Sequence, residues 1–242
     1  MRMASEKQLL MTMTGEIQQP IRLYYQVFDQ AAVLQAFAKL RCMDDDQDNH
    51  RWVWLYHGEA KKLKFHTSYA AIPRKMRPII LGSFRFRNAE DMSLDVRSWE
   101  RATQAVVFFD RYLKRSIAHV THAAIVNRLF PYTAGGLPEL EGLFAPEKVT
   151  EIHAEEMLQR AAASLKTIHD PGQRMDMAFA LMERQSNERL PDVEKFPMHY
   201  YEDGITSLEN ALRLRQIVAF EHWQGHTDYT LGDIIRQVTA GL

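Results

Sequence analysis

Two short runs in the middle of the chain alternate apolar and polar residues, which is typical of β-strands with one buried face. The runs cover residues 80–86 and 92–97. A five-residue loop between them, Arg87–Asp91, places Phe84 opposite Leu94, whereas a four-residue loop would pair buried positions with exposed ones. We therefore predict a β-hairpin whose apolar side chains lie on one face and whose arginines and Asp95 lie on the other.

A helix is predicted directly after this hairpin. Ser98 is a favourable N-cap, and Glu100 in the first turn interacts well with the positive end of the helix dipole. The residues that follow place a stripe of apolar side chains on one face at the 3.6-residue period of a helix. This stripe consists of Trp99, Ala102, Val106, Phe109 and Leu113. The hairpin and the helix together form a predicted ββα unit.

Other segments of the first 130 residues extend this unit into a sheet. Residues 21–28 are rich in β-branched and aromatic side chains and predict a strand, and a helix is predicted from Asp29 to about residue 40. Residues 51–57 and 61–65 predict two further strands, and residues 117–130 predict one or two more. Paired short strands with two helices predict an α+β fold, in which an antiparallel sheet has two helices on one face.

The second half of the chain has helical patterns throughout. Residues 131–146 contain three prolines and three glycines, which predicts a linker. Helical periodicity follows, except in residues 187–204, which have no regular pattern and predict a loop. We therefore expect a basic α+β domain over residues 1–130, a Pro/Gly-rich linker over 131–146, and an acidic, all-helical, bundle-like domain over 147–242.

Charge is distributed unevenly along the 242 residues, although the net charge is only −1. Residues 1–130 hold 20 Lys/Arg against 13 Asp/Glu, and residues 131–242 hold 10 against 18. This asymmetry predicts an anionic partner for the first half. The alternative is that the two halves attract each other, within one chain or between the subunits of a homo-oligomer.

The basic excess is concentrated between Arg51 and Arg87, where nine Lys/Arg accompany one acidic residue, Glu59. Aromatic residues are interleaved with these cations. A polyanion needs cations to replace its counterions, and unpaired bases need aromatic faces for stacking. The alternative is that the aromatic residues form core and the cations face solvent. The candidate polyanion-binding residues are Lys61, Lys62, Lys64, Arg74, Lys75, Arg77, Arg85 and Arg87.

A second candidate site lies near the C-terminus. His222 and His226 are four residues apart, so one helix face could present both to a metal ion, with Asp228 or Glu221 as an oxygen ligand. The spacing differs from HExxH because the glutamate is missing, and Gly225 interrupts the helix where His226 needs it. Surface histidines at a helix end are the alternative.

No complete catalytic or cofactor motif is present, and the sequence therefore identifies no cofactor. There is no G-x-S-x-G, and Gly135-Gly136 lacks the lysine of a phosphate loop. No apolar run approaches the roughly 20 residues of a membrane span, so no membrane partner is expected. The first residues lack the apolar region of a signal peptide, and the single cysteine, Cys42, fits a reducing compartment, which together predict a cytoplasmic protein.

Three function classes remain open on these observations. The leading hypothesis is a non-catalytic protein whose basic sheet domain binds nucleic acid or another polyanion. The first alternative is a metal-dependent hydrolase that uses the His222/His226 site. The second is a structural or scaffold protein that recognises another protein.

Overall fold

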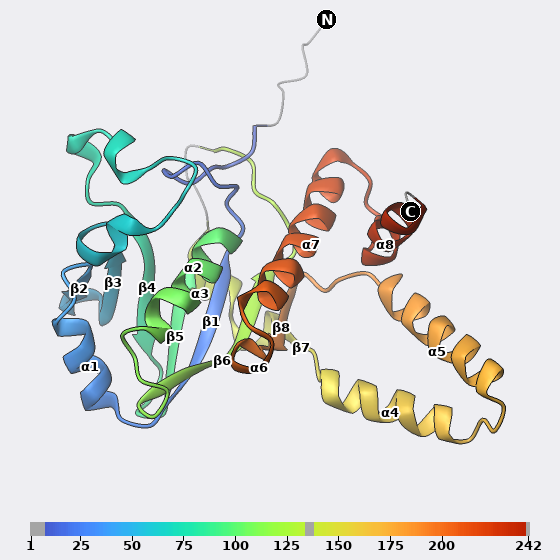
Figure 1. Cartoon of the computed structure of the whole chain (residues 1–242). Coiled ribbons are helices and arrows are strands. Elements are labelled where there is room, and N and C mark those ends of the chain that lie inside the picture. The colour runs from blue at the N-terminus through green and yellow to red at the C-terminus, as the bar shows by residue number, and fades with distance from the viewer. Residues whose placement is uncertain (1–7, 134–137, 241–242) are drawn as a thin grey trace, which may run out of the picture.

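The computed structural model describes residues 8–133 and 138–240, and its centre is one eight-stranded sheet (Figure 1). The strand order is β2-β3-β4-β5-β1-β6-β8-β7, and every neighbouring pair is antiparallel except β7 and β8. The strands are β1 (Ile21–Val27), β2 (Met43–Asp46), β3 (Arg51–Leu55), β4 (Ile80–Phe86), β5 (Asp91–Val96), β6 (Ala118–Val126), β7 (Thr150–Glu151) and β8 (Val193–Pro197). The fold is therefore α+β, as predicted.

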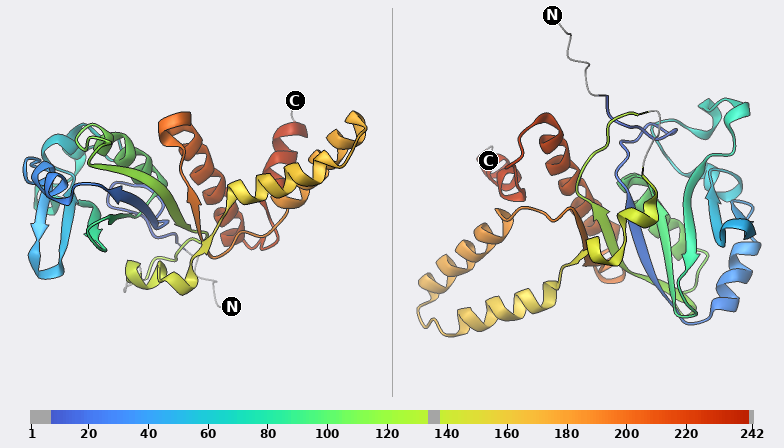
Figure 2. Two further views of the ribbon diagram at one scale, coloured as in Figure 1. Left: turned by 90° about the horizontal axis from the view of Figure 1, so that it is seen from below. Right: turned by 180° about the vertical axis from the view of Figure 1, so that it is seen from behind.

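Helices lie on both faces of this sheet and beyond its β7 edge. They are α1 (Gln30–Ala38), α2 (Trp99–Asp110), α3 (Leu140–Leu143), α4 (Ala154–Lys166), α5 (Pro171–Ser186), α6 (Tyr200–Asp203), α7 (Ile205–Gln224) and α8 (Leu231–Ala240). Helices α1, α2 and α7 cover one face, which we call the inner face. Helix α3 crosses the opposite, outer face, and α4 and α5 project away from the sheet as a two-helix arm (Figure 2).

The predicted ββα unit is confirmed. In the β4–β5 pair, Phe84 lies opposite Leu94 and Phe86 opposite Met92, as the five-residue loop requires. The Ser98 hydroxyl accepts a hydrogen bond from the Arg101 amide at 3.2 Å and caps α2. One position was predicted wrongly: Ile80 is 49% exposed and Leu81 is buried, because the β3–β4 pairing shifts register beside Leu55.

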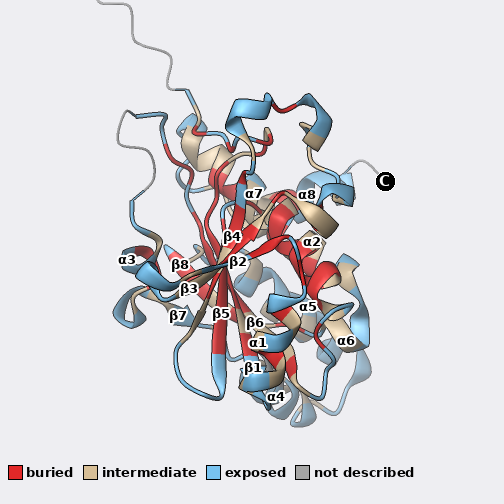
Figure 3. Cartoon of the chain, turned by 90° about the vertical axis from the view of Figure 1, so that its left-hand side faces the viewer, coloured by how far each residue is buried: buried red, intermediate tan, exposed pale blue. Residues whose placement is uncertain are grey.

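The main core lies between the inner face and its helices. The Phe84 ring packs against Phe37 of α1 and Phe109 of α2, with ring centroids 4.8 and 4.7 Å apart. Both predicted helices therefore cover the same face, and buried residues concentrate along the middle of the sheet (Figure 3). A smaller apolar cluster, which includes Phe144 and Val126, lies on the outer face next to α3.

Residues 61–65 do not form the strand that their alternation predicted. The segment is a 3₁₀ turn over Gly58–Lys62 followed by irregular chain, within the long connection between β3 and β4. Both edges of β3 are occupied, by β2 and by β4, so this connection has no free strand edge beside β3 to pair with. The Tyr56 hydroxyl fixes the connection instead, by donating a hydrogen bond to the Leu63 carbonyl at 3.0 Å.

The prediction that residues 147–242 are entirely helical is wrong. Strands β7 and β8 belong to the sheet, and β8 pairs with β6 from Val126↔Val193 to His122↔Pro197. The alternation of apolar and polar residues did not indicate β8, because Glu194, a charged residue, occupies a buried position of the strand. Arg215 of α7 forms an ion pair with Glu194 there. The sheet thus contains strands from both sides of the predicted linker, of which residues 134–137 lie outside the described residues. Two separate domains remain a prediction.

None of the described helices is long and apolar enough to cross a membrane.

The core assignment predicts that Phe84→Ala lowers the free energy of unfolding by about 3–5 kcal/mol, because it removes a fully buried ring. Phe28→Ala is the matched control, because Phe28 is 54% exposed, and we expect a change of less than about 1 kcal/mol. Urea unfolding followed by circular dichroism measures both. Equal losses in the two variants would contradict the assignment.

Candidate functional site

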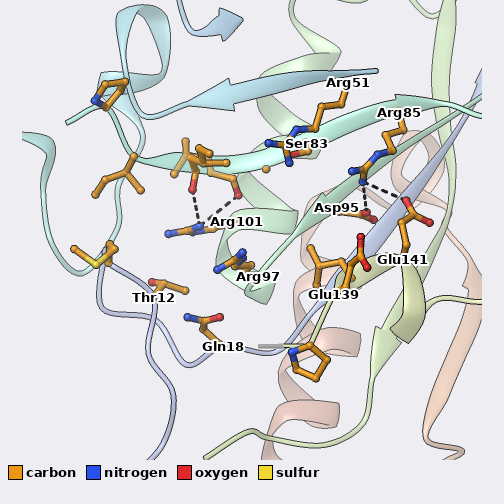
Figure 4. A pocket seen from close by; sticks show the side chains of 18 of the residues that line it. Thr12, Gln18, Arg51, Ser83, Arg85, Asp95, Arg97, Arg101, Glu139 and Glu141 are labelled. Atoms are coloured by element: carbon orange, nitrogen blue, oxygen red, sulfur yellow. Dashed lines mark hydrogen bonds and ion pairs between the residues drawn. The ribbon is translucent and has the colours of Figure 1, made fainter. Parts of the chain in front are cut away.

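A cleft of about 700 Å³ lies at one end of the outer face. Its walls come from the N-terminal segment around Thr12 and Gln18, the start of β4, the end of β5, and residues 138–141 before and within α3. Four arginines line it, namely Arg51, Arg85, Arg97 and Arg101 (Figure 4). We call this cavity the arginine cleft.

Strand alternation brings three of these arginines to the same face. In the pairing of β4 with β5, Ser83 lies opposite Asp95, so Arg85 and Arg97, each two residues further along its strand, share the outer face with them. Arg51 is two residues before Val53, which lies opposite Ser83, so it belongs to this face too. The fourth, Arg101, reaches the cleft from the first turn of α2.

Arg101 holds the wall of the cleft together. Its guanidinium donates to the carbonyls of Ile80 and Leu81 at 3.1 and 3.4 Å and to the Thr14 hydroxyl at 2.7 Å. Its Nε lies 3.5 Å from the buried Glu16 carboxylate. Burial lowers the pKa of Arg101 to about 10, against the opposing effect of Glu16. Arg101 therefore anchors the N-terminal segment to β4 and has a structural role.

Arg97 differs from the other three because its side chain is unpaired. It points into the cleft (Figure 4), and among the described residues no hydrogen bond or ion pair engages its guanidinium. Partial removal of water lowers the pKa of Arg97, and its charge also lowers the pKa of Arg101. The Arg97 side chain is nevertheless exposed, so an anion in solution can reach a guanidinium that has no counterion among the described residues.

Two of the three carboxylates that line the cleft, Asp95 and Glu141, are engaged by arginines, whereas the third, Glu139, is exposed and has no ion pair among the described residues. Asp95 accepts two hydrogen bonds from the buried Arg22, at 2.6 and 2.8 Å. Glu141 lies 3.0 Å from Arg22 and 3.2 Å from Arg85. Burial alone would lower the pKa of Arg22, but Asp95 and Glu141 outweigh it and raise that pKa. Arg51 in turn is paired with Asp46 at 2.7 Å, outside the lining of the cleft.

A second hollow, of about 440 Å³, continues along the outer face from the arginine cleft. Arg85 and Glu141 line both cavities, and Arg87 and Ser93 line only the second. Beside it, Arg87 and Lys195 lie over the Tyr24 ring, at 5.7 and 5.1 Å from its centroid. The two hollows and these cations form an extended trough, which we call the outer trough.

The structure divides the eight predicted cations into two groups. Arg85 and Arg87 lie in the outer trough, as described above. The other six lie in the β3–β4 connection, whose residues Met76 and Pro78 line the arginine cleft. Four of these are exposed, and their side chains make no hydrogen bond or ion pair among the described residues: Lys62, Lys64, Arg74 and Lys75.

The remaining two cations, Lys61 and Arg77, stack on one aromatic ring. They lie over Tyr69, at 4.7 and 4.5 Å from its centroid. Arg77 also donates to the carbonyls of Ala70 and Ile72 within the connection, so part of its role is to hold this segment.

The aromatic residues interleaved with these cations belong mainly to the core. Trp54 and Tyr56 are almost fully buried, and Trp52 and Phe65 pack against the main core. Their burial favours the alternative in which the aromatic residues stabilise the fold and only the cations face outward.

Two of the cleft arginines were missed by the sequence argument. Arg97 and Arg101 lie outside the basic stretch of residues 51–87 on which that argument concentrated. The signal for Arg97 was present in the alternation of the hairpin, which places it on the same face as Asp95. Arg101 had no comparable signal, because its approach to β4 depends on how α2 packs.

The predicted metal ligands have other partners. His222 Nε2 lies 2.8 Å from the Tyr229 carbonyl, and His226 Nδ1 lies 2.6 Å from the Glu221 carboxylate. Gly225, with φ of 107°, ends α7, so His226 lies beyond the helix. The described residues contain no group of three or more His, Cys, Asp or Glu that could hold a metal ion. The site with Asp228 stays a prediction without further support.

Comparison with known proteins gave no match to a family model, a curated protein or a solved structure. The functional argument therefore depends on the geometry of the arginine cleft and the outer trough.

The different roles of Arg97 and Arg101 predict different effects on stability. Arg97→Ala should change the free energy of unfolding by less than about 0.5 kcal/mol, because it breaks no described interaction. Arg101→Ala should lower it by about 3–5 kcal/mol, because it leaves Glu16 buried without its cation. Chemical denaturation measures both variants, and a large loss for Arg97→Ala would show that it has a structural role instead.

Proposed function

We propose that the protein is a non-catalytic binding protein whose basic N-terminal half engages nucleic acid or another polyanion at the arginine cleft. The observation that carries the proposal is the unpaired Arg97 guanidinium, which points into a cavity lined by three further arginines. A guanidinium can donate two parallel hydrogen bonds to a phosphate. The cleft thus offers one well-defined position for an anionic group.

A chain of anions fits the surroundings of the cleft better than a single small anion does. The outer trough extends from the cleft past Arg85 to Arg87 and Lys195, so cations follow one another along the outer face. On the other side, the exposed Arg74 and Lys75 directly precede the lining residues Met76 and Pro78 in the β3–β4 connection. Each neutralised phosphate releases condensed counterions, which is the main source of affinity for polyanions.

The polar groups of the cleft support binding more than catalysis. Asp95 and Glu141 are engaged by arginines, so neither is placed as a free general base, and Glu139, the third lining carboxylate, is exposed to solvent. Ser83 and Thr12 line the cleft, but the described lining residues include no histidine or cysteine beside them. We place the protein in the cytoplasm, because its single cysteine, Cys42, fits a reducing compartment.

The test is a salt titration of binding to labelled single-stranded and duplex oligonucleotides, followed by fluorescence anisotropy. We expect affinity to fall linearly with log salt concentration, with a slope of about −0.7 to −0.9 per phosphate contact. Arg97→Ala should weaken binding and reduce the slope by about one contact. Arg160→Ala is the matched control, because Arg160 is an exposed arginine of α4, away from the cleft, and should change neither.

A second pair of substitutions distinguishes the contribution of the cleft to binding from that of the β3–β4 connection. Lys62→Glu with Lys64→Glu should also weaken binding and flatten the salt dependence, so the loss of affinity relative to the wild type should be largest at low salt, where charge interactions are least screened. The proposal is contradicted if the wild type does not bind even at low salt. It is also contradicted if Arg97→Ala and Arg160→Ala bind equally well.

A further inference from the structure

The two-helix arm exposes an apolar surface that nothing in the described chain covers. No residue of α5 is buried, and the arm extends away from the sheet and from α7 (Figures 1 and 2). Phe179 and Met182 are 64% and 65% exposed, and Met175 is similarly exposed beside them. Large exposed apolar patches on folded proteins typically mark interaction sites.

This surface contains both projecting apolar side chains and hollows that are lined mainly by apolar residues. One hollow of about 390 Å³ lies around Leu165, Ala178 and Met182, and a second of about 410 Å³ shares these three residues and extends towards Ile152. The projecting Phe179 borders the first hollow. In a two-fold symmetric interface the same surface of both chains meets, so that surface must be complementary to itself. A projecting side chain next to an apolar hollow meets this requirement, because each side chain can enter the hollow of the other chain.

We propose that the arm is a homodimerisation element, in which α4 and α5 of two chains pack face to face as an antiparallel four-helix bundle. In this arrangement the Phe179 ring of each chain enters the apolar hollow of the other. The 16 residues of α5 give a helix about 24 Å long, and two such hairpins provide the layered apolar core of a small bundle. The proposal is independent of polyanion binding.

The nearly balanced charge of the arm is compatible with pairing to a second copy. Residues 154–186 carry five acidic and four basic side chains, so two arms do not repel each other strongly. The bodies of the two chains also stay apart, because the arm projects from them. The arm itself has a fixed base, since Arg236 of α8 donates to Asn187 at the end of α5 at 2.9 Å.

Close packing strengthens this base. Gly232 of α8 approaches Asn187 so closely that a Cβ at Gly232 would lie 2.3 Å from the Asn187 side-chain oxygen. At this same base the arm is continuous with the sheet, because α4 follows β7 and α5 leads into β8. The dimer therefore forms between two arms of defined position on their bodies.

The experiment measures the mass of the full-length protein in solution by sedimentation velocity over a range of concentrations. We expect the wild type to be a dimer, and Phe179→Glu to be a monomer, because a buried carboxylate at the interface is costly. Met177→Glu is the matched control. Met177 is 45% exposed, lines neither hollow, and lies roughly 160° around α5 from Phe179, so this variant should remain dimeric.

Cysteine cross-linking gives a second readout that does not depend on a disruptive substitution. The native Cys42 is buried, so an added surface cysteine reacts selectively. Under a mild oxidant, Met182→Cys should form a covalent dimer much faster than Met177→Cys does. Far-ultraviolet circular dichroism checks that every variant keeps its helices.

Three results would overturn the proposal. The first is a wild type that is monomeric at all concentrations tested, which would indicate that the arm binds another protein or a lipid surface instead. The second is a dimer that survives Phe179→Glu, which would place the interface elsewhere. The third is equal cross-linking of Met182→Cys and Met177→Cys. Arg97→Ala should remain dimeric in every case, so failure of polyanion binding leaves this result unaffected.

Discussion

The buried ion pair between Arg22 and Asp95 determines the charge of the arginine cleft. The two residues lie opposite each other on β1 and β5, and Asp95 accepts both hydrogen bonds of the Arg22 fork. Because Arg22 satisfies this carboxylate, Asp95 does not neutralise Arg97, which lies two residues further along the same face. Removing either partner would bury an uncompensated charge, which typically costs several kcal/mol. Strand register, fixed by the apolar inner face, thus determines which cation remains free.

A second buried pair joins the later part of the chain to the same sheet. Glu194 of β8 accepts hydrogen bonds from Arg215 of α7 at 2.6 and 3.0 Å and from Asn127 at 2.7 Å. The next residue, Lys195, points to the other face and lies over Tyr24 in the outer trough. Alternation along one short strand therefore fixes α7 on the inner face and adds a cation on the outer face. The sheet thereby links the outer trough to the base of the arm.

The sequence predicted the elements that depend on local pattern and missed those that depend on tertiary contacts. The register of the hairpin and the Ser98 cap follow from alternation and capping chemistry, and both are confirmed. Strand β8 was missed because Glu194 is a buried carboxylate whose partner, Arg215, comes from a distant helix. Arg85 was identified from composition, whereas the role of Arg101 depends on the packing of α2 against β4. Local periodicity carries no information about such long-range partners.

The most direct test of the central claim is an NMR titration that observes the arginine Nε–Hε signals while a single-stranded oligonucleotide is added at low salt. The account predicts that the signals of Arg97 and Arg85 shift together and saturate, because both guanidinium groups meet the bound anions, while the signal of the distant Arg160 stays unchanged. Shifts confined to signals outside the arginine cleft and the outer trough, or no saturable shift of Arg97, would contradict it.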